Sequence, residues 1–274
     1  MTITHKSIQS VTFYLLIVLL IVVNSCSSDE VKPTQDPILD HYIETVEGPA
    51  DDILSQYKTN YKYNSAGKLH GFSIFLYDPG RQSYSEERHF NFTYLADSLR
   101  KIEGFLAADA DHAYVEYSFS YFSDGRVSEI HEINRSAGVN SVANFYYDEV
   151  NKSGKVLYAY SNGRSFQYEF TMQDGNIVAD RETQGSQLCN EGQYIYDQHP
   201  NPFQRLGFVD NFLTNFSTNN KLVQNVEYTA CVFPTVRPEY YTYEYDNREY
   251  PIAATGFYKS GNSFGKIKRQ IFYR

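Results

Sequence analysis

Paired carboxylates and acid–histidine neighbours are the first groups in this sequence that could do chemistry. Asp51-Asp52 and Glu86-Glu87 are paired acids, and two carboxylates that flank one bond can hydrolyse a glycoside. Sequence neighbours point to opposite faces of a strand, so each pair is a poor dyad. Asp109 and Asp111 share one side of an extended chain next to His112, which would permit a calcium contact. Solvated loop charges are the more ordinary interpretation.

The histidines follow no known catalytic spacing. His112 and His131 lack the His-Glu-x-x-His pattern of a zinc hydrolase. The chain also has no Walker loop and no dinucleotide-binding fingerprint. We therefore predict a protein that is not an enzyme and that holds no metal or cofactor.

Two cysteines in the second half of the chain form a candidate disulfide. Cys189 and Cys231 are the only cysteines after Cys26. In an oxidising compartment outside the inner membrane they are expected to pair. Such a bridge would stabilise the fold by about 4 kcal/mol in the chain-entropy model, less any strain. The alternative is two reduced cysteines, one of them buried in a strand.

Cys26 is the candidate site of lipid attachment. Val11–Val23 is a nearly unbroken apolar run after a short polar start, and it is shorter than the roughly 20 residues that cross a bilayer. Its length is typical of a secretory signal peptide. Val23-Asn24-Ser25-Cys26 resembles a bacterial lipobox, which implies cleavage before Cys26 and a diacylglycerol on its sulfur. The alternatives are an ordinary signal peptide with an incidental cysteine, or a retained membrane anchor.

The residues after Cys26 are polar and acidic. Ser27-Ser28-Asp29-Glu30 resembles the export signal of Bacteroidetes-type lipoproteins, which implies exposure at the cell surface; the alternative is a simple polar tether. Pro33, Pro37 and Pro49 lie among scattered acids, a composition typical of a linker. We therefore predict a lipoprotein signal peptide at residues 1–25, a lipidated Cys26 with an acidic tether at residues 26–55, and one folded domain at residues 56–274.

The elements that must position these groups are short strands joined by tight turns. In residues 117–130, Tyr117, Phe119 and Tyr121 alternate with serines, so they share one face of an extended chain. Asp124-Gly125 is a two-residue turn signal, because Gly adopts a positive φ without steric cost. A similar unit recurs about eight times, with irregular spacing. The units include Tyr61, Phe90, Tyr117, Phe145, Tyr168, Tyr194, Phe212 and Tyr241.

These repeats predict an all-β fold. The chain has 26 Tyr and 19 Phe but no Trp, and Tyr and Phe favour strands. One hairpin cannot bury its aromatic face alone, so successive hairpins must stack into an antiparallel meander. We expect about eight repeated hairpins in one long sheet that twists or curls over its aromatic face. The sheet is either open or closed into a barrel.

The units also resemble a known group of repeats. Phe119-Ser120-Tyr121-Phe122-Ser123-Asp124-Gly125-Arg126-Val127 and Tyr243-Glu244-Tyr245-Asp246-Asn247-Arg248 are similar to the tyrosine–aspartate repeats of rearrangement-hotspot proteins. They resemble still more the uncharacterised Bacteroidetes surface lipoproteins with tyrosine-rich hairpins. The resemblance covers roughly residues 56–274. It implies an extended β-sheet scaffold and no catalytic residue.

Charge and anchor together set the expected function. The formal net charge is −9, which excludes a basic footprint for nucleic acid. We predict a lipid-anchored protein of the outer membrane, exposed at the cell surface, that binds a glycan or a protein partner. Tyr rings suit both ligands, although lining the sheet's own core is the ordinary role for most of them. The alternatives are a structural or envelope-assembly component and, with less support, a glycan hydrolase.

Overall fold

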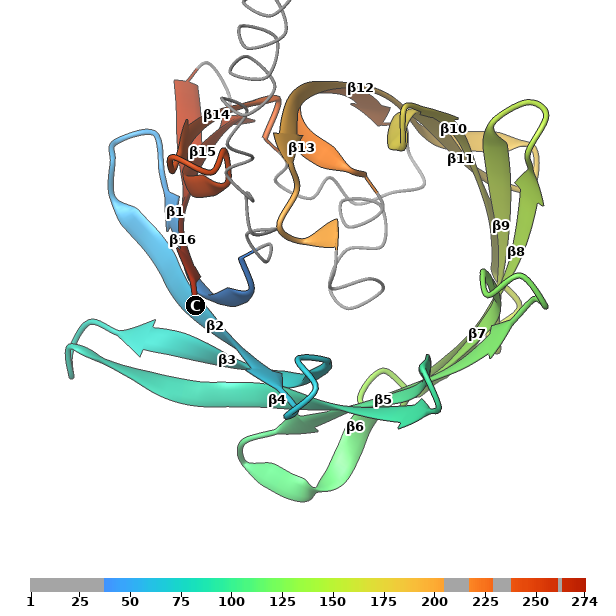
Figure 1. Cartoon of the computed structure of the whole chain (residues 1–274), viewed down its shortest axis with the longest axis horizontal. Helices are drawn as coiled ribbons and strands as arrows, with labels where there is room; N and C mark the ends of the chain where they lie inside the picture. Colours follow the sequence, from blue (N-terminus) through green and yellow to red (C-terminus); the bar gives the residue numbers. More distant parts are fainter. Residues whose placement is uncertain (1–36, 205–216, 229–237, 261–262) are drawn as a thin grey trace, which may run out of the picture. The chain divides into compact units, whose positions relative to one another are not determined.

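The computed structural model describes residues 37–204, 217–228, 238–260 and 263–274. Within these residues, the compact unit Ile38–Arg274 contains sixteen antiparallel strands, which form a closed barrel (Figure 1). The sequence predicted about eight hairpins and left closure open. The strands are β1 (Leu39–Glu47), β2 (Ile53–Tyr63), β3 (Leu69–Asp78), β4 (Ser83–Leu95), β5 (Ser98–Leu106), β6 (Asp109–Tyr121), β7 (Val127–Asn134), β8 (Val139–Asp148), β9 (Ser153–Tyr160), β10 (Ser165–Gln173), β11 (Asn176–Gln184), β12 (Gln187–Pro200), β13 (Asn219–Tyr228), β14 (Tyr240–Tyr245), β15 (Pro251–Ser260) and β16 (Ser263–Tyr273).

The barrel closes by pairing its first strand with its last. The β1–β16 register runs from Leu39 opposite Tyr273 to Glu47 opposite Lys266. Beyond the ladder, the Arg274 N–H donates to the Ile38 carbonyl at 3.0 Å. Every other strand pairs with its neighbours in sequence, so the described sheet has no free edge to recruit another chain.

The start of the barrel corrects the predicted tether. β1 and the first residues of β2 lie inside the segment that was assigned to the linker, so the folded domain begins at Leu39 and not at residue 56. Leu39 is buried and Tyr42 half-buried on the inner face, with a register shift between Leu39 and His41. The acids scattered through this segment obscured the strand pattern in the sequence. Two of them form ion pairs with cations of β16: Glu44 with Arg269 and Glu47 with Lys268.

The two faces of the sheet have opposite polarity. On β6, Phe119 is 5% exposed, whereas Ser118 and Ser120 are exposed, which confirms the predicted alternation. One core cluster joins the apolar side chains of nearly every strand. Side chains converge only on the concave side of a barrel, so this aromatic face is the inner one.

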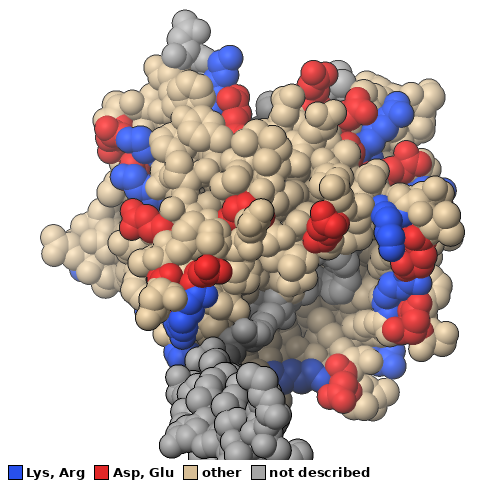
Figure 2. Space-filling view, turned by 45° about the horizontal axis from the view of Figure 1, so that its top comes forward, with Lys and Arg blue, Asp and Glu red and all other residues tan. Residues whose placement is uncertain are grey.

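A contact across the ring supports the same assignment. Phe203 follows β12, yet its ring packs edge-on against Tyr42 of β1, with centroids 5.6 Å apart. The Arg269 guanidinium of β16 lies 5.8 Å from the same ring. Strands β13 to β15 separate β12 from β16 in the sheet, so these groups meet on the inside. The outer face carries Lys and Arg beside Asp and Glu across the visible surface (Figure 2). It also carries exposed apolar side chains, among them Ile195, Tyr240 and Phe264.

Asp side chains and residues with a positive φ form the turns. Asp124 Oδ1 accepts the Arg126 N–H at 3.0 Å, and Gly125 has a φ of 87°. Asp246 accepts the Arg248 N–H at 2.9 Å in the same way. Glu249 takes the left-handed position there, with a φ of 67°. Asp124 and Asp246, which follow the tyrosines of their units, are therefore turn residues. Each accepts a backbone N–H two residues later, as in an Asx turn.

Tyrosine hydroxyls tie five of the strands to the strand before each of them. Tyr121 at the end of β6 donates to the Leu99 carbonyl at the start of β5, at 2.6 Å. The bond satisfies a carbonyl at the end of the ladder that would otherwise lack a partner. Equivalent bonds join Tyr63 to Leu39, Tyr196 to Ile177, Tyr243 to Lys221 and Tyr273 to Pro251.

These buried tyrosines predict alkaline unfolding. Burial raises the pKa of Tyr94, Tyr147 and Tyr196 to about 12, while the unfolded chain loses such protons near pH 10. The folded state thus holds more protons between these values, so stability is intact below pH 10 and falls as the pH rises toward 12. Tyrosinate absorbance and the loss of the far-UV circular dichroism signal should therefore change in one transition. Full tyrosine titration near pH 10 with the sheet intact would contradict this.

Glycines on the inner face make room for aromatic rings on the neighbouring strand. Gly154 of β9 lies directly opposite Phe170 of β10. A Cβ at Gly154 would lie 2.8 Å from both Cε atoms of the Phe170 ring, which is well inside van der Waals contact. Similar pairs are Gly104 with Phe90, Gly256 with Tyr241 and Gly265 with Tyr258.

Candidate functional site

The residues that the sequence singled out for lipidation and disulfide formation are only partly described. Cys26 and Cys231 lie outside the described residues, as does Phe212 of the seventh predicted unit. Cys189 lies on β12 and is fully buried. Lipidation at Cys26 and the Cys189–Cys231 pairing both remain predictions. Over the described part of the chain, no helix has the length and hydrophobicity to cross a membrane.

The candidate acids and histidines do not gather into one site. The His89 Nδ1 lies 2.9 Å from a Glu86 carboxylate oxygen, and the His112 Nδ1 lies 2.9 Å from Asp109. Asp51 forms an ion pair with Lys266 at 2.7 Å. In the described ranges, no three His, Cys, Asp or Glu side chains come together in a way that could hold a metal ion.

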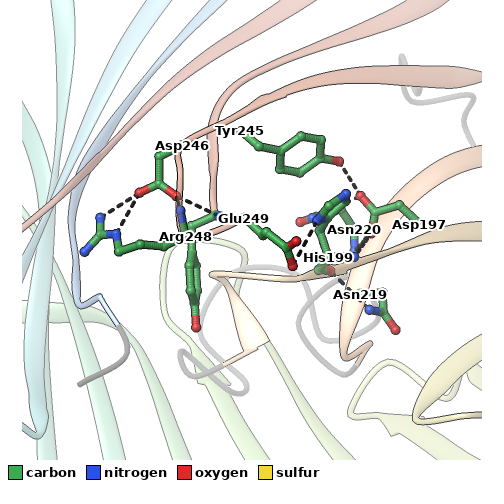
Figure 3. Close-up of polar contacts among 9 residues, drawn as sticks. Asp197, His199, Asn219, Asn220, Tyr245, Asp246, Arg248 and Glu249 are labelled. Carbon is green, nitrogen blue, oxygen red and sulfur yellow. Dashed lines mark hydrogen bonds and ion pairs between the residues drawn. The ribbon is translucent and has the colours of Figure 1, made fainter. Parts of the chain in front are cut away.

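A polar centre that sequence reasoning missed surrounds Asp197, at the end of β12 (Figure 3). Its Oδ1 accepts the backbone N–H groups of His199 and Asn220, at 2.9 and 3.1 Å. Its Oδ2 accepts the Asn220 amide at 3.2 Å and the Tyr245 hydroxyl of β14. The His199 ring stacks on Tyr245 with centroids 4.1 Å apart, and Glu249 lies 3.9 Å from its Nδ1. The Tyr194-Ile195-Tyr196-Asp197 pattern was the available signal.

This centre stabilises the weakest seam of the barrel. β13 and β14 pair directly only through Val223 and Tyr240, so contacts from β12 to β14 support the gap. Burial, followed by the hydrogen bond to Asp197, raises the pKa of Tyr245, which keeps it a donor. Asp197 accepts four hydrogen bonds, two on each carboxylate oxygen. The arrangement therefore links the end of β12 to β13 and β14.

A second buried acid is Asp180, on the inner face of β11. It is 5% exposed, and its Oδ2 accepts the hydroxyls of Tyr168 and Tyr194 at 2.8 and 2.6 Å. Its Oδ1 has no hydrogen-bond partner among the described residues. Burial first, and then the Asp180 charge, raise the pKa of Tyr168 well above its usual value. Asp180 belongs to the buried inner face, and it is also one of the residues that line the groove described next.

A groove of about 530 Å³ is lined by residues of β8–β12, most of them on the outer face, and we call it the outer groove. Four of its lining residues belong to the inner face: Tyr147, Gly154, Phe170 and Asp180. Its charged row runs directly across five strands: Tyr146, Lys155, Glu169, Arg181 and Glu191. The next row has small side chains, Ser153, Thr171 and Ala179, again in register. Three short side chains in one row leave a hollow beside longer ones. A volume in this range is typical of ligand pockets.

The charges of the outer groove make no ion pairs with one another. Lys155, Glu169, Arg181 and Glu191 alternate in sign at directly opposed positions, yet none has an ion pair within 4.0 Å among the described residues. Elsewhere on the outer face, neighbouring charges do form ion pairs. Lys101 contacts Glu103 at 2.6 Å and Glu116 at 2.9 Å, and Arg135 also pairs with Glu116.

Comparison with known proteins identifies a fold and no family. No family model matches the chain, and no curated protein matches it. A porin-like protein from Bacteroides uniformis is similar in structure, with a TM-score of 0.54 and 13% identity over 86% of this chain and 98% of that one. A porin-like protein from Bacteroides vulgatus gives a TM-score of 0.43 and 11% identity over 87% and 99%.

The likeness to the Bacteroides uniformis protein defines the class of the fold alone. The chain has the closed antiparallel barrel of the Bacteroides uniformis protein, and an identity this low transfers no activity. The barrel agrees with the predicted all-β meander in its closed form. The function must therefore be argued from the surfaces of the barrel.

Proposed function

We propose that this protein is a lipid-anchored component of the cell envelope whose barrel lies in water and binds a glycan or a protein partner without catalysing a reaction. One observation carries the proposal: the aromatic face points inward and the charged face points outward. Membrane barrels have the reverse pattern, with an apolar outer band and a polar interior.

The outer charges are incompatible with a lipid surface. Lys101 and Glu103 of β5, Lys155 of β9 and Arg181 of β11 all belong to the outer face. A Lys or Arg on the lipid side costs about 2–4 kcal/mol at the bilayer midplane. Charges on so many strands would together make insertion of the barrel into the bilayer unfavourable. A lipid on Cys26 would then attach the barrel to the outer membrane without inserting it.

The inward acids support a non-catalytic role. Asp197 and Asp180 hold strands together through tyrosine hydroxyls, and the acids after the tyrosine pairs form turns. The alternative function is a structural or envelope-assembly component that takes no small ligand. A glycan hydrolase is a third candidate, which turnover of a labelled polysaccharide would reveal.

Replacing Cys26 with Ala tests the proposal in full-length protein. We expect wild-type protein to fractionate with membranes and to incorporate labelled palmitate. The Cys26→Ala form should incorporate none and should leave the membrane in an alkaline carbonate wash. Ser27→Ala, which keeps the lipid-accepting thiol, is the matched control and should behave as wild type. A Cys26→Ala protein that resists carbonate extraction would mean that the barrel itself is embedded in the bilayer.

A further inference from the structure

The outer groove has the chemistry of a binding site for a neutral glycan. Its charged row alternates groups that can only donate hydrogen bonds, Lys155 and Arg181, with groups that can only accept them, Glu169 and Glu191. A hydroxyl both donates and accepts. A chain of hydroxyl-bearing units can thus satisfy each position along the row.

The alternating charges of the row disfavour charged polymers. The two cations and two anions of the row cancel, so a polyanion would meet a carboxylate at every second strand and a polycation would meet an ammonium or a guanidinium. These side chains have no ion pairs to break within the described residues, in contrast to the closed Lys101–Glu103–Glu116 network. A ligand therefore meets them without first breaking an ion pair.

The shape of the outer groove favours an extended ligand. Five strands at a spacing of about 4.8 Å make the row roughly 19 Å long. Tyr146 ends the row and is 49% exposed, with the Lys155 ammonium 5.5 Å from its ring. The ring offers a flat apolar face for the C–H side of a sugar. The row of Ser153, Thr171 and Ala179 forms the floor on which the chain would lie.

We infer that the outer groove binds a neutral glycan chain laid across β8–β12, with Arg181 and Glu169 as its central hydrogen-bonding residues. The inference rests on the proposed function, because it requires the outer face to be in water. Glu169 already accepts one hydrogen bond, from the Gln167 amide at 2.8 Å, which orients the carboxylate and leaves further lone pairs open.

Calorimetric titration tests the site with defined probes: cello-, malto-, manno- and xylo-oligosaccharides as neutral chains, polygalacturonate as a polyanion and chitosan as a polycation. Lipidated protein in detergent micelles serves as the sample, so the outcome does not depend on the solubility of the Cys26→Ala form. We expect a neutral oligosaccharide to bind, and polygalacturonate and chitosan to bind at least about tenfold more weakly. Tenfold corresponds to about 1.4 kcal/mol.

Variants locate the binding. Arg181→Ala and Glu169→Gln should each weaken the neutral ligand by about tenfold or more, since hydrogen bonds to charged groups are the stronger ones. Thr171→Tyr should abolish binding by filling the floor while leaving the melting temperature unchanged, because Thr171 is exposed. Glu103→Gln, in the closed network on the same face, is the control and should bind as wild type.

Three results would overturn the inference: no neutral probe binds, a charged polymer binds more tightly than every neutral one, or Arg181→Ala and Thr171→Tyr bind like wild type. These results are distinct from a failure of the proposed function. That failure would be seen if Cys26→Ala protein stayed in carbonate-washed membranes.

Discussion

Phe119→Ala should destabilise the barrel by about 3–5 kcal/mol, the usual cost of truncating a buried phenylalanine. Phe119 belongs to the inner aromatic cluster and lies opposite Ile130 of β7. Removing its ring leaves a cavity that β-strands on a closed ring cannot collapse, since each strand is held on both sides. Urea unfolding followed by circular dichroism measures the loss of stability.

The neighbouring position provides the control. Ser120 points outward, opposite Glu129, so Ser120→Ala should change stability by no more than about 0.5 kcal/mol. The same contrast is expected in another unit, where Tyr243 should be sensitive and Glu244 tolerant. Equal losses for Phe119→Ala and Ser120→Ala would show that both faces of β6 are buried, against the single-layer barrel.

Gly154→Ala, which adds a single methyl group, should destabilise the barrel by about 1–3 kcal/mol or more. The added Cβ would overlap the Phe170 ring, which covers Gly154 from the neighbouring strand. Phe170 is itself packed in the core, so the ring cannot swing aside freely. Thermal unfolding of the variant should show a clearly lowered midpoint.

A second substitution distinguishes overlap from a general effect on the strand. Phe170→Leu should destabilise wild-type protein but cost less in the Gly154→Ala background, because the smaller side chain makes room for the methyl group; such coupling is the mark of direct contact. Gly80→Ala is the matched control, since its added Cβ would approach only Asp78 Oδ1, at 3.2 Å, in an exposed turn. Additive effects of the two substitutions would refute the overlap.

Local patterns of the sequence predict much of this fold. Alternation fixed the inner face of β6, and the Asp124-Gly125 turn lies where it was predicted, because both depend on residues next to each other in the chain. The tether boundary was wrong because the acids of β1 mask its alternation; their partners, such as Arg269, lie at the far end of the chain.

The outer groove and the closure of the barrel could not be predicted in this way. Ser153, Thr171 and Ala179 form a floor only because three strands bring them into one row. Bulges shift that row, as between Thr171 and Met172, and sequence spacing does not reveal them. Whether β1 meets β16 depends on the accumulated twist and curvature of the whole sheet, to which every strand contributes.

The pairing of β1 with β16 also has a kinetic consequence. Each remaining pairing joins consecutive strands, so it can form rapidly by local zipping, whereas the last one must bring together segments separated by nearly the whole chain. During synthesis β1 emerges first and must wait, with one edge unpaired, until β16 has been made. Over that interval the nascent protein exposes a strand edge that the finished barrel conceals, and this is when it has most need of a chaperone.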